Sequence, residues 1–317
     1  FAAGGIAVAM APAAPGKLIL CGEHAVVFGE PALSTAINLR TEVFARPHTE
    51  WLADGASLGE PRYRYVKEAL GRAWKGDPLW LEIRSMIPTG AGLGSSAAVT
   101  VATLGAIHEL EGHNVDPPVI AREAFEVEHE VQGRASPIDT STATAGGGIL
   151  VRREAGDGLL WSIERDTRQW FLHRCALPPL TFVVGNTGIS AATGPLVAGV
   201  KKRVDGSPKA AERVKEIGQI TFDGLAALQR KDLEAAGRLM DRDHELLNEL
   251  GVGHPMLDKL VTAARAHSYG AKLTGAGGGG SMFALTDRPE KVAQLIRDAG
   301  GKAFLVQSDP QGVRRLP

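Results

Sequence analysis

The 317-residue chain lacks an excess of charge of either sign, because 35 lysine and arginine residues stand against 36 aspartate and glutamate residues. Nucleic-acid binding calls for a strongly basic surface, so we expect no nucleic-acid partner. Cysteine is also scarce. Cys21 and Cys175 cannot build a disulfide framework, and we interpret both as small buried hydrophobes in a reducing, cytoplasmic setting.

Long apolar runs are missing too, and none approaches the roughly 20 residues that a membrane-spanning helix needs, so we expect no membrane partner. Residues 1–10 are apolar and rich in Ala and Gly but carry no positive charge, which argues against a secretory signal peptide. We expect them to be an extension ahead of a natural start at Met10. The remainder is long enough for one large domain or two medium-sized domains.

Glycine, by contrast, is abundant, with 39 residues, and one dense motif runs Pro88-Thr89-Gly90-Ala91-Gly92-Leu93-Gly94-Ser95-Ser96. An Ala-rich stretch that predicts a helix follows it. Glycine permits positive φ and lets a ligand approach the peptide N–H groups. Together with the positive end of the next helix, such groups form a cradle for a polyphosphate.

The motif therefore predicts a nucleotide phosphate site, in which a hydroxyl at the helix start can also reach a magnesium ion on the phosphates. The predicted cofactor-binding residues are Gly90, Ala91, Gly92, Leu93, Gly94, Ser95 and Ser96. The spacing is neither that of a dinucleotide fingerprint nor that of a P-loop. Taken alone, the motif leaves open a plain glycine-rich turn in which Ser95 caps the helix.

The segment from Pro118 to Val131 predicts a helix with a polar and an apolar face. Ala121, Ala124 and Phe125 share the apolar face, and Glu128 falls on it at the same three- and four-residue steps. Burial of a carboxylate is costly unless the group is paired or binds a metal, so the pattern indicates Glu128 as a magnesium ligand. The alternative is a carboxylate near the helix end that reaches solvent.

Strands and helices are expected to alternate, which favours α+β or α/β layering. The Pro178-Pro179 pair is the predicted boundary between domains at residues 11–179 and 180–317. The expected strands are 18–21, 25–28, 80–84, 149–151, 180–184, 271–273, 282–285 and 303–306. The expected helices are 97–110, 118–131, 209–230, 232–250, 255–267 and 290–299.

Two further segments share the character of the glycine motif: APGKLILCGEHAVVFG at 14–29 and KLTGAGGGGSMF at 272–283. In this order, the three segments resemble the signature motifs of the GHMP superfamily of galactokinases, homoserine kinases, mevalonate kinases and phosphomevalonate kinases. The run GEHAVV at 22–27 and AINLRT at 36–41 look most like those of the mevalonate kinases. The resemblance covers roughly residues 15–285. It implies an α+β fold with an N-terminal α/β nucleotide-binding domain, a C-terminal ferredoxin-like α/β domain and the nucleotide between them.

The resemblance also implies roles for individual residues. Asp139 matches the catalytic aspartate that takes the proton of the acceptor hydroxyl, and Lys17 matches the lysine that pairs with it. Ser96 and Glu128 match the two magnesium ligands. From the pattern alone, Asp139 is equally a helix N-cap ahead of a Thr- and Ser-rich run. Whether it acts as a true base or only orients the acceptor stays open, because phosphoryl transfer needs little basicity.

Glu23, His24 and Thr193 match positions that contact the acceptor in the family. For His24 the alternative is a structural histidine hydrogen-bonded inside a turn. The chain has Ala191 and Gly194 where some members carry Arg and Lys, which leaves open how the acceptor carboxylate is bound. The loop 275–280 is expected to support the phosphate cradle from the second domain rather than to be a flexible connector.

These motifs predict an ATP- and Mg²⁺-dependent kinase that phosphorylates the primary hydroxyl of mevalonate and acts in isoprenoid precursor synthesis. One alternative is a kinase of the same fold that acts on phosphomevalonate, homoserine or a sugar. Another is an oxidoreductase with a dinucleotide on the glycine motif, although the third-glycine spacing and a clear acidic ribose partner are missing. A third is a nucleotide-binding module without catalysis. A homodimer is expected from the resemblance.

Overall fold

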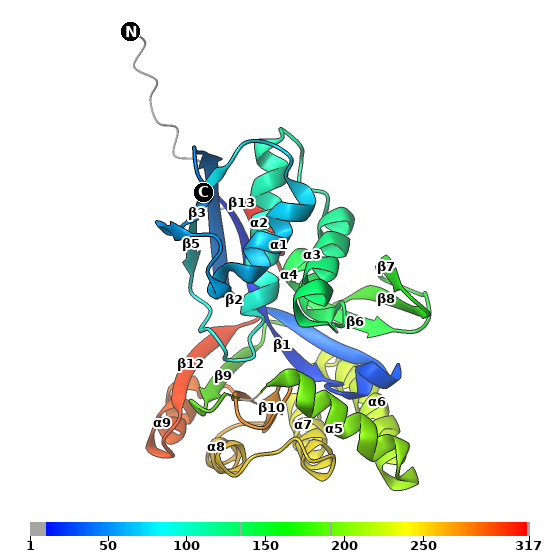
Figure 1. Ribbon diagram of the computed structural model, residues 1–317. Coiled ribbons are helices and arrows are strands. Elements are labelled where there is room, and N and C mark those ends of the chain that lie inside the picture. The colour runs from blue at the N-terminus through cyan, green and yellow to red at the C-terminus, as the bar shows by residue number, and fades with distance from the viewer. Residues whose placement is uncertain (1–10, 134, 191, 316–317) are drawn as a thin grey trace.

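The computed structural model describes residues 11–315 except 134 and 191. The expected extension at residues 1–10 and the departure from the family at Ala191 therefore lie outside the described residues. Two sheets organise the described chain, one with nine strands and one with four, and Figure 1 shows them in the upper and lower halves of the molecule.

The nine-stranded sheet follows the order β4-β3-β5-β2-β6-β8-β7, with β1 and β13 paired beside that path. Its long central strand β2 pairs with β6 through residues 32–35 and with β5 through residues 41–47. The last described strand, β13, pairs with β1, so the end of the chain returns to the first sheet. The strands are β1 (Pro12–Cys21), β2 (Ala32–Pro47), β3 (Leu52–Ala53), β4 (Ala56–Ser57), β5 (Leu79–Ser85), β6 (Gly148–Arg152), β7 (Leu159–Arg165), β8 (Arg168–Cys175) and β13 (Arg314–Arg315).

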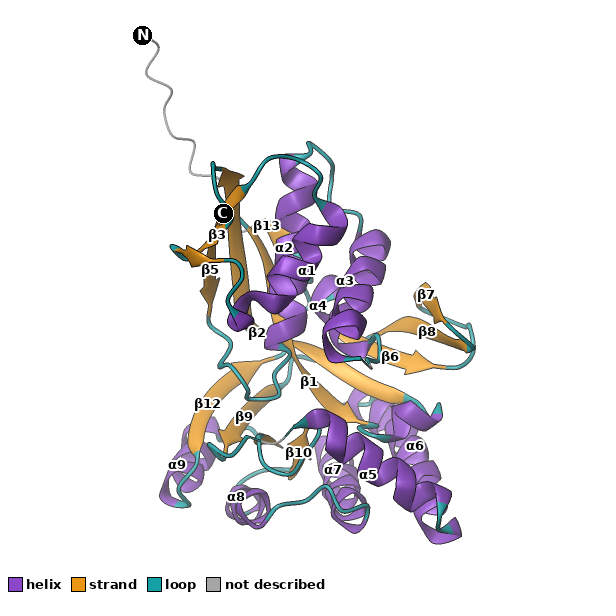
Figure 2. Ribbon diagram, in the orientation of Figure 1, coloured by secondary structure: helices purple, strands orange, loops and turns teal. Residues whose placement is uncertain are grey.

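Four helices lie on one side of this sheet, as Figure 2 shows. They are α1 (Arg64–Ala73), α2 (Ser95–Leu110), α3 (Pro117–Gln132) and α4 (Ile138–Ala145). Helix α2 is apolar almost all round, as expected of a helix that packs against the sheet and between other helices. The buried turns from Ala97 onward thereby fix the half-buried N-terminus of α2.

The four-stranded sheet has the order β10-β11-β9-β12 and is antiparallel throughout. Its elements are β9 (Thr181–Asn186), α5 (Thr193–Asp205), α6 (Pro208–Gln229), α7 (Leu233–Glu249), α8 (Pro255–Arg265), β10 (Gly270–Thr274), β11 (Ser281–Leu285), α9 (Pro289–Asp298) and β12 (Lys302–Gln307). Strand, helices, two strands, helix and strand in this sequence make the βαββαβ arrangement of ferredoxin-like domains, with extra helices in the first crossover. The expected α+β fold is confirmed.

Most expected elements are present with ends shifted by a few residues, but one expected strand is wrong. Residues 25–28 form a 3-10 helix, η1 (Ala25–Phe28), instead. The φ angles of His24 (61°) and Gly29 (87°) on either side are positive, which an extended strand cannot accommodate. The sheets change between β8 and β9, near the predicted boundary at 179 and 180, but β13 crosses back, and the boundary stays a prediction.

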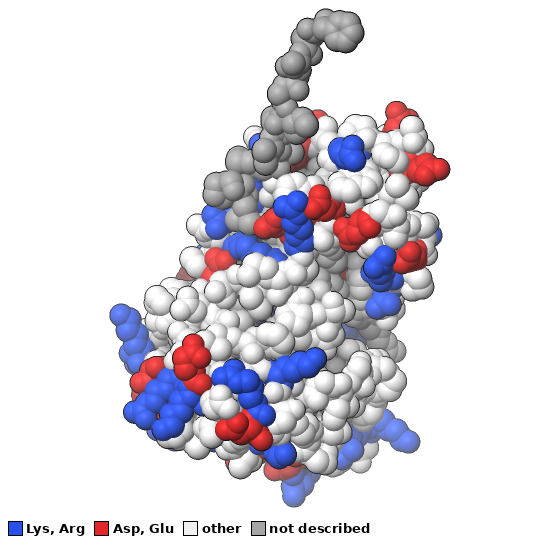
Figure 3. All heavy atoms as spheres, turned by 90° about the vertical axis from the view of Figure 1, so that its left-hand side faces the viewer, with Lys and Arg blue, Asp and Glu red and all other residues white. Residues whose placement is uncertain are grey.

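The surface reflects the balanced composition. On the face shown in Figure 3, lysines and arginines mix with aspartates and glutamates, and a broad uncharged area crosses the middle. Within residues 11–315, no helix has the length and apolar character needed to cross a bilayer. Cys21 is buried as expected, whereas Cys175 is only half-buried.

Candidate active site

The glycine motif forms the connection into α2. Gly90, Gly92 and Gly94 have φ angles of 72°, 72° and 76°, so the three alternating glycines occupy the left-handed conformation that other residues rarely adopt. Gly94 is the N-cap of α2, and no side chain caps this helix, so the alternative in which Ser95 acts only as a cap does not hold. Ala98 donates the first helical hydrogen bond, to Gly94 O at 2.9 Å. The N–H groups of the preceding turn lie outside the helical ladder at its positive end.

Lys17 on β1 joins this motif to α4. Its backbone N–H donates to Leu93 O at 2.8 Å, and its Nζ donates to Gly92 O at 3.2 Å. The same Nζ lies 3.1 Å from Oδ2 of Asp139, in the first turn of α4. The lysine side chain is only 3% exposed. One buried ammonium group therefore brings together three segments that are far apart in the sequence.

Two glycines at this junction are required for space. A Cβ on Gly94 would lie 2.8 Å from Lys17 Cγ, and a Cβ on Gly16 would lie 2.8 Å from the backbone oxygen of Leu93. Real Cβ atoms essentially never come so close. The close approach of β1 to the glycine motif thus depends on these two missing side chains.

Glu128 lies on the buried face of α3, where the helical pattern places it, and is 3% exposed. Its Oε1 accepts a hydrogen bond of 3.0 Å from the hydroxyl of Ser96. Burial, together with the nearby charge of Asp139, raises the pKa of Glu128 to about 8. The alternative in which this carboxylate reaches solvent is excluded by its burial.

The oxygens of this cluster fit a magnesium ion. A hydroxyl from Ser96 and a carboxylate oxygen from Glu128 are ligands that Mg²⁺ prefers. Within the described part of the chain, no three His, Cys, Asp or Glu side chains are grouped closely enough to form a complete metal cage. Such an ion would complete its coordination with phosphate oxygens and water, as Mg²⁺ commonly does.

His24 contacts the second glycine-rich loop. Its Nε2 lies 2.9 Å from the backbone oxygen of Ala276, so Nε2 carries a proton and donates it to that hydrogen bond. Burial lowers the pKa of His24, which keeps the ring neutral and leaves Nδ1 as an acceptor. The hydrogen bond crosses from one half of the molecule to the other, so it is not contained within a local turn.

Glu23 lies in a buried ion cluster that the sequence analysis missed. Its Oε1 is 2.5 Å from Lys272 Nζ, which is also 3.4 Å from Oδ2 of Asp243 on α7. Burial alone would lower the pKa of Lys272, but the two carboxylates raise it. Burial raises the pKa of Asp243 to about 7, because one lysine cannot balance two buried carboxylates. A lysine between the apolar residues Ala271 and Leu273 was the available signal.

The loop 275–280 lies directly against the glycine motif. A Cβ on Gly92 would lie 3.5 Å from Thr274 O, and a Cβ on Gly275 would lie 3.8 Å from Gly92 Cα. All five glycines of the loop have positive φ. The structure thus supports its predicted place beside the phosphate cradle, while its contact with phosphate stays a prediction.

Thr193 is the first residue of α5 and is exposed, and the neighbouring Gly194 continues the helix. No hydrogen bond within the described residues links the Thr193 side chain to Asp139 or His24. Its part in acceptor binding stays a prediction.

Two family models match the chain: that of the GHMP kinases N terminal domain at residues 62–147 and that of the GHMP kinases C terminal at residues 225–304. Fold and matches together define a small-molecule kinase of the GHMP class.

Individual relatives narrow the class further. The chain is 36% identical to a mevalonate kinase of Pyrococcus horikoshii, over 95% of this chain and 96% of the relative. It is 35% identical to a mevalonate kinase of Archaeoglobus fulgidus, over 96% of this chain and 99% of the relative. The crystal structure of L. major mevalonate kinase in complex with R-mevalonate matches with a TM-score of 0.81 and 26% identity, over 95% of this chain and 96% of that one. The chain belongs to the mevalonate kinase family.

Proposed function

We propose that this enzyme transfers the γ-phosphoryl group of ATP to the primary hydroxyl of mevalonate, giving 5-phosphomevalonate for isoprenoid synthesis. The observation that carries the proposal is the position of Lys17 Nζ, within 3.2 Å of Gly92 O and 3.1 Å of Asp139 Oδ2. A phosphate cradle and a carboxylate suited to an acceptor hydroxyl therefore share one cation. Relatives named mevalonate kinase that cover almost the whole chain support the choice of acceptor.

The nucleotide triphosphate is proposed to lie on the N–H groups of residues 90–96, at the positive end of α2. There the γ-phosphorus faces α4, where Asp139 orients the acceptor hydroxyl and receives its proton. Lys17 stabilises the negative charge of Asp139 and that of the transferring group. Transfer then requires the acceptor oxygen to lie in line with the bond that breaks.

Ser96 and Glu128 are proposed to hold Mg²⁺. When bound, the ion neutralises phosphate charge and helps to orient the triphosphate. Glu128 must first release the proton that its burial favours.

The acceptor is proposed to contact Glu23, His24 and Thr193, and the ion pair of Glu23 with Lys272 holds the turn that carries His24. The neutral ring of His24 donates from Nε2 to Ala276, so Nδ1 offers an acceptor for a substrate hydroxyl rather than a donor for a carboxylate. We further place the enzyme in the cytoplasm, because its two cysteines are free, and expect a homodimer from the family.

Release of ADP, measured with a coupled assay, tests the proposal against its alternatives. Mevalonate, phosphomevalonate, homoserine and galactose are offered separately with ATP and Mg²⁺. We expect turnover with mevalonate at least about tenfold above that with any other acceptor. Preference for another acceptor would reassign the substrate. ATP binding without turnover would indicate a non-catalytic module, and NADH binding without a response to ATP would indicate an oxidoreductase.

A further inference from the structure

Strand β10 is the edge strand of the four-stranded sheet, since β11 is its only strand neighbour in the described sheet order. Two of its outward N–H groups are nevertheless paired. Ala271 N–H donates to Asp241 Oδ1 at 2.9 Å, and Leu273 N–H donates to His244 Nδ1 at 3.2 Å. Asp241 and His244 are three residues apart on α7 and therefore share one face of the helix. Side chains of α7 thus take the place of a neighbouring strand.

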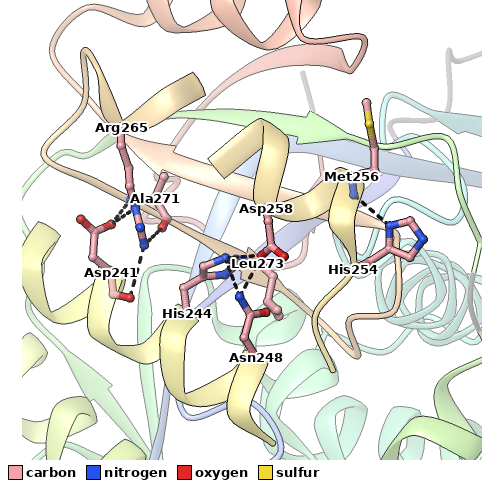
Figure 4. Close-up of polar contacts among 9 residues, drawn as sticks. All are labelled: Asp241, His244, Asn248, His254, Met256, Asp258, Arg265, Ala271 and Leu273. Carbon is pink, nitrogen blue, oxygen red and sulfur yellow. Dashed lines mark hydrogen bonds and ion pairs between the residues drawn. The ribbon is translucent and has the colours of Figure 1, made fainter. Parts of the chain in front are cut away.

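Both acceptors are held from α8, and Figure 4 shows the two sets of contacts side by side. Arg265 Nε donates to Asp241 Oδ1 at 2.7 Å. His244 Nε2 lies 3.0 Å from Asp258 Oδ1, which also accepts a hydrogen bond of 2.8 Å from Asn248.

These contacts fix the protonation state of His244. Because Nδ1 accepts from a backbone N–H group, Nδ1 must be unprotonated, and the ring proton lies on Nε2 and points to Asp258. Burial and, to a smaller extent, the charges of Arg265 and Lys272 lower the pKa of His244 to about 4, although Asp258 opposes this effect. The ring is therefore neutral in the working range of a cytoplasmic enzyme.

The contact at Leu273 lies very near the catalytic centre along the chain. Only Thr274 separates Leu273 from the loop 275–280, whose first residue lies against Gly92. Ala276 of the same loop accepts the hydrogen bond from His24. Five glycines provide no side chains to fix this loop. Backbone hydrogen bonds from Gly278 N–H to Val252 O and from Gly280 N–H to Ile189 O hold its later part, both at 2.7 Å, whereas its first residues follow directly from the end of β10.

We propose that His244 is a positioning residue for phosphoryl transfer: by holding the N–H of Leu273, it keeps the loop 275–280 seated against Gly92 and His24. The inference rests on the proposed function, because it concerns the same catalytic centre. Asp258 supports it by keeping the ring in the tautomer that accepts. Asp241 accepts a hydrogen bond from the N–H of Ala271 in the same way, but two residues further from the loop. We therefore expect Asp241 to contribute only to stability.

Three variants separate positioning from plain stabilisation. His244→Asn keeps an acceptor atom at the place of Nδ1, whereas His244→Gln reaches Asp258 but leaves Leu273 N–H without an acceptor. Asp241→Ala is the matched control, because it removes the acceptor of Ala271 instead. For each variant we would measure the melting temperature, kcat and KM for ATP and mevalonate, and hydrogen exchange of the peptide covering residues 273–280.

We expect His244→Gln to lower kcat about tenfold per folded molecule and to speed exchange at 273–280, with His244→Asn within threefold of the wild type. Asp241→Ala should lower the melting temperature but keep kcat within twofold. Unchanged kcat in His244→Gln, or an equal loss in Asp241→Ala, would overturn the inference. If His244→Gln fails to fold, Asp258→Asn replaces it, because this change leaves the tautomer of His244 unspecified. We expect Asp258→Asn to lower kcat and to speed hydrogen exchange at residues 273–280. Wild-type values of both would refute the positioning role. Turnover of the wild type with mevalonate, measured in parallel, tests the proposed function separately. Hydrogen exchange at residues 273–280 reports on the loop and does not depend on which substrate the enzyme uses.

Discussion

Lys17 Nζ contacts one oxygen of Asp139, Oδ2, at 3.1 Å, while the other oxygen, Oδ1, is buried without a hydrogen-bond partner. The Asp139 side chain as a whole is 26% exposed, so the carboxylate lies at the edge of the solvent, although Oδ1 itself is buried. A buried acceptor without a partner is costly, and a hydroxyl placed beside it would satisfy it. This pairing gives Asp139 one oxygen fixed by Lys17 and one unpaired, buried oxygen, which we expect a bound acceptor hydroxyl to contact.

Asp139→Asn is expected to reduce kcat by about 10²–10⁴-fold, the usual contribution of a positioned proton acceptor. An amide cannot accept the hydroxyl proton, but it fills the same space beside Lys17. Nucleotide affinity should stay within about threefold. Coupled ADP release and calorimetric titration with an ATP analogue measure the two effects. Turnover equal to that of the wild type would remove Asp139 from the chemistry.

Gly94→Ala is expected to displace Lys17, because the added methyl would lie 2.8 Å from its Cγ. The φ angle of 76° adds a backbone cost of about 1–2 kcal/mol. Both nucleotide affinity and kcat should fall. Gly112→Ala provides the control, because its φ of 75° imposes the same strain, whereas its Cβ would meet nothing within 4 Å and it lies outside the glycine motif. Equal losses in the two variants would show that strain, not the contact with Lys17, is responsible.

Magnesium affinity is expected to rise with pH up to about 8. Burial raises the pKa of Glu128 to about 8, so below this pH a proton competes with the metal for the carboxylate. Glu128→Gln should raise the magnesium concentration for half-maximal activity at least about tenfold and flatten this pH dependence. Magnesium titrations at several pH values, at fixed ATP, provide the measurement. A wild-type affinity that does not change between pH 6 and 8.5 would argue against Glu128 as a ligand.

Stability should fall on acidification through the range in which His244 titrates. Its pKa is about 6.5 in the unfolded chain and about 4 in the folded protein, so the unfolded state binds more protons between these values. The neutral ring contributes up to about 3 kcal/mol to the free energy of unfolding. This contribution is fully present above pH 6.5 and is lost as the pH falls toward 4. Denaturant unfolding at pH 4.5 and 7 measures it. His244→Asn should lose less stability between pH 7 and pH 4.5 than the wild type does. Identical losses of stability would contradict the assignment of this effect to His244.

Much of the fold was predictable from local patterns. The helix that carries Glu128 and the helix after the glycine motif begin and end within two residues of their expected ends, because apolar periodicity and helix-terminal residues are local signals. The 3-10 helix at residues 25–28 was not predictable in this way, because its short apolar sequence also fits a strand. The residue type signals the positive φ of His24 only weakly, because histidine is enriched in this conformation but still adopts it rarely.

The site was predictable only in part, for a related reason. Glycine spacing and the helix face of Glu128 are visible in the sequence, and resemblance supplied Lys17 and Asp139. The cluster of Glu23, Asp243 and Lys272 joins residues up to 249 positions apart, and only the folded chain brings them together. His244 is hidden in the same way, since its neighbour Leu273 belongs to another element.

The claim that β1, the glycine motif and α4 meet around one triphosphate is tested most directly by a crystal structure with a non-hydrolysable ATP analogue, Mg²⁺ and mevalonate. We predict phosphates on the N–H groups of residues 90–96, with the γ-phosphorus between Lys17 and the mevalonate primary hydroxyl and that hydroxyl within hydrogen-bond distance of Asp139. A triphosphate bound elsewhere, or an acceptor hydroxyl out of reach of Asp139, would contradict it.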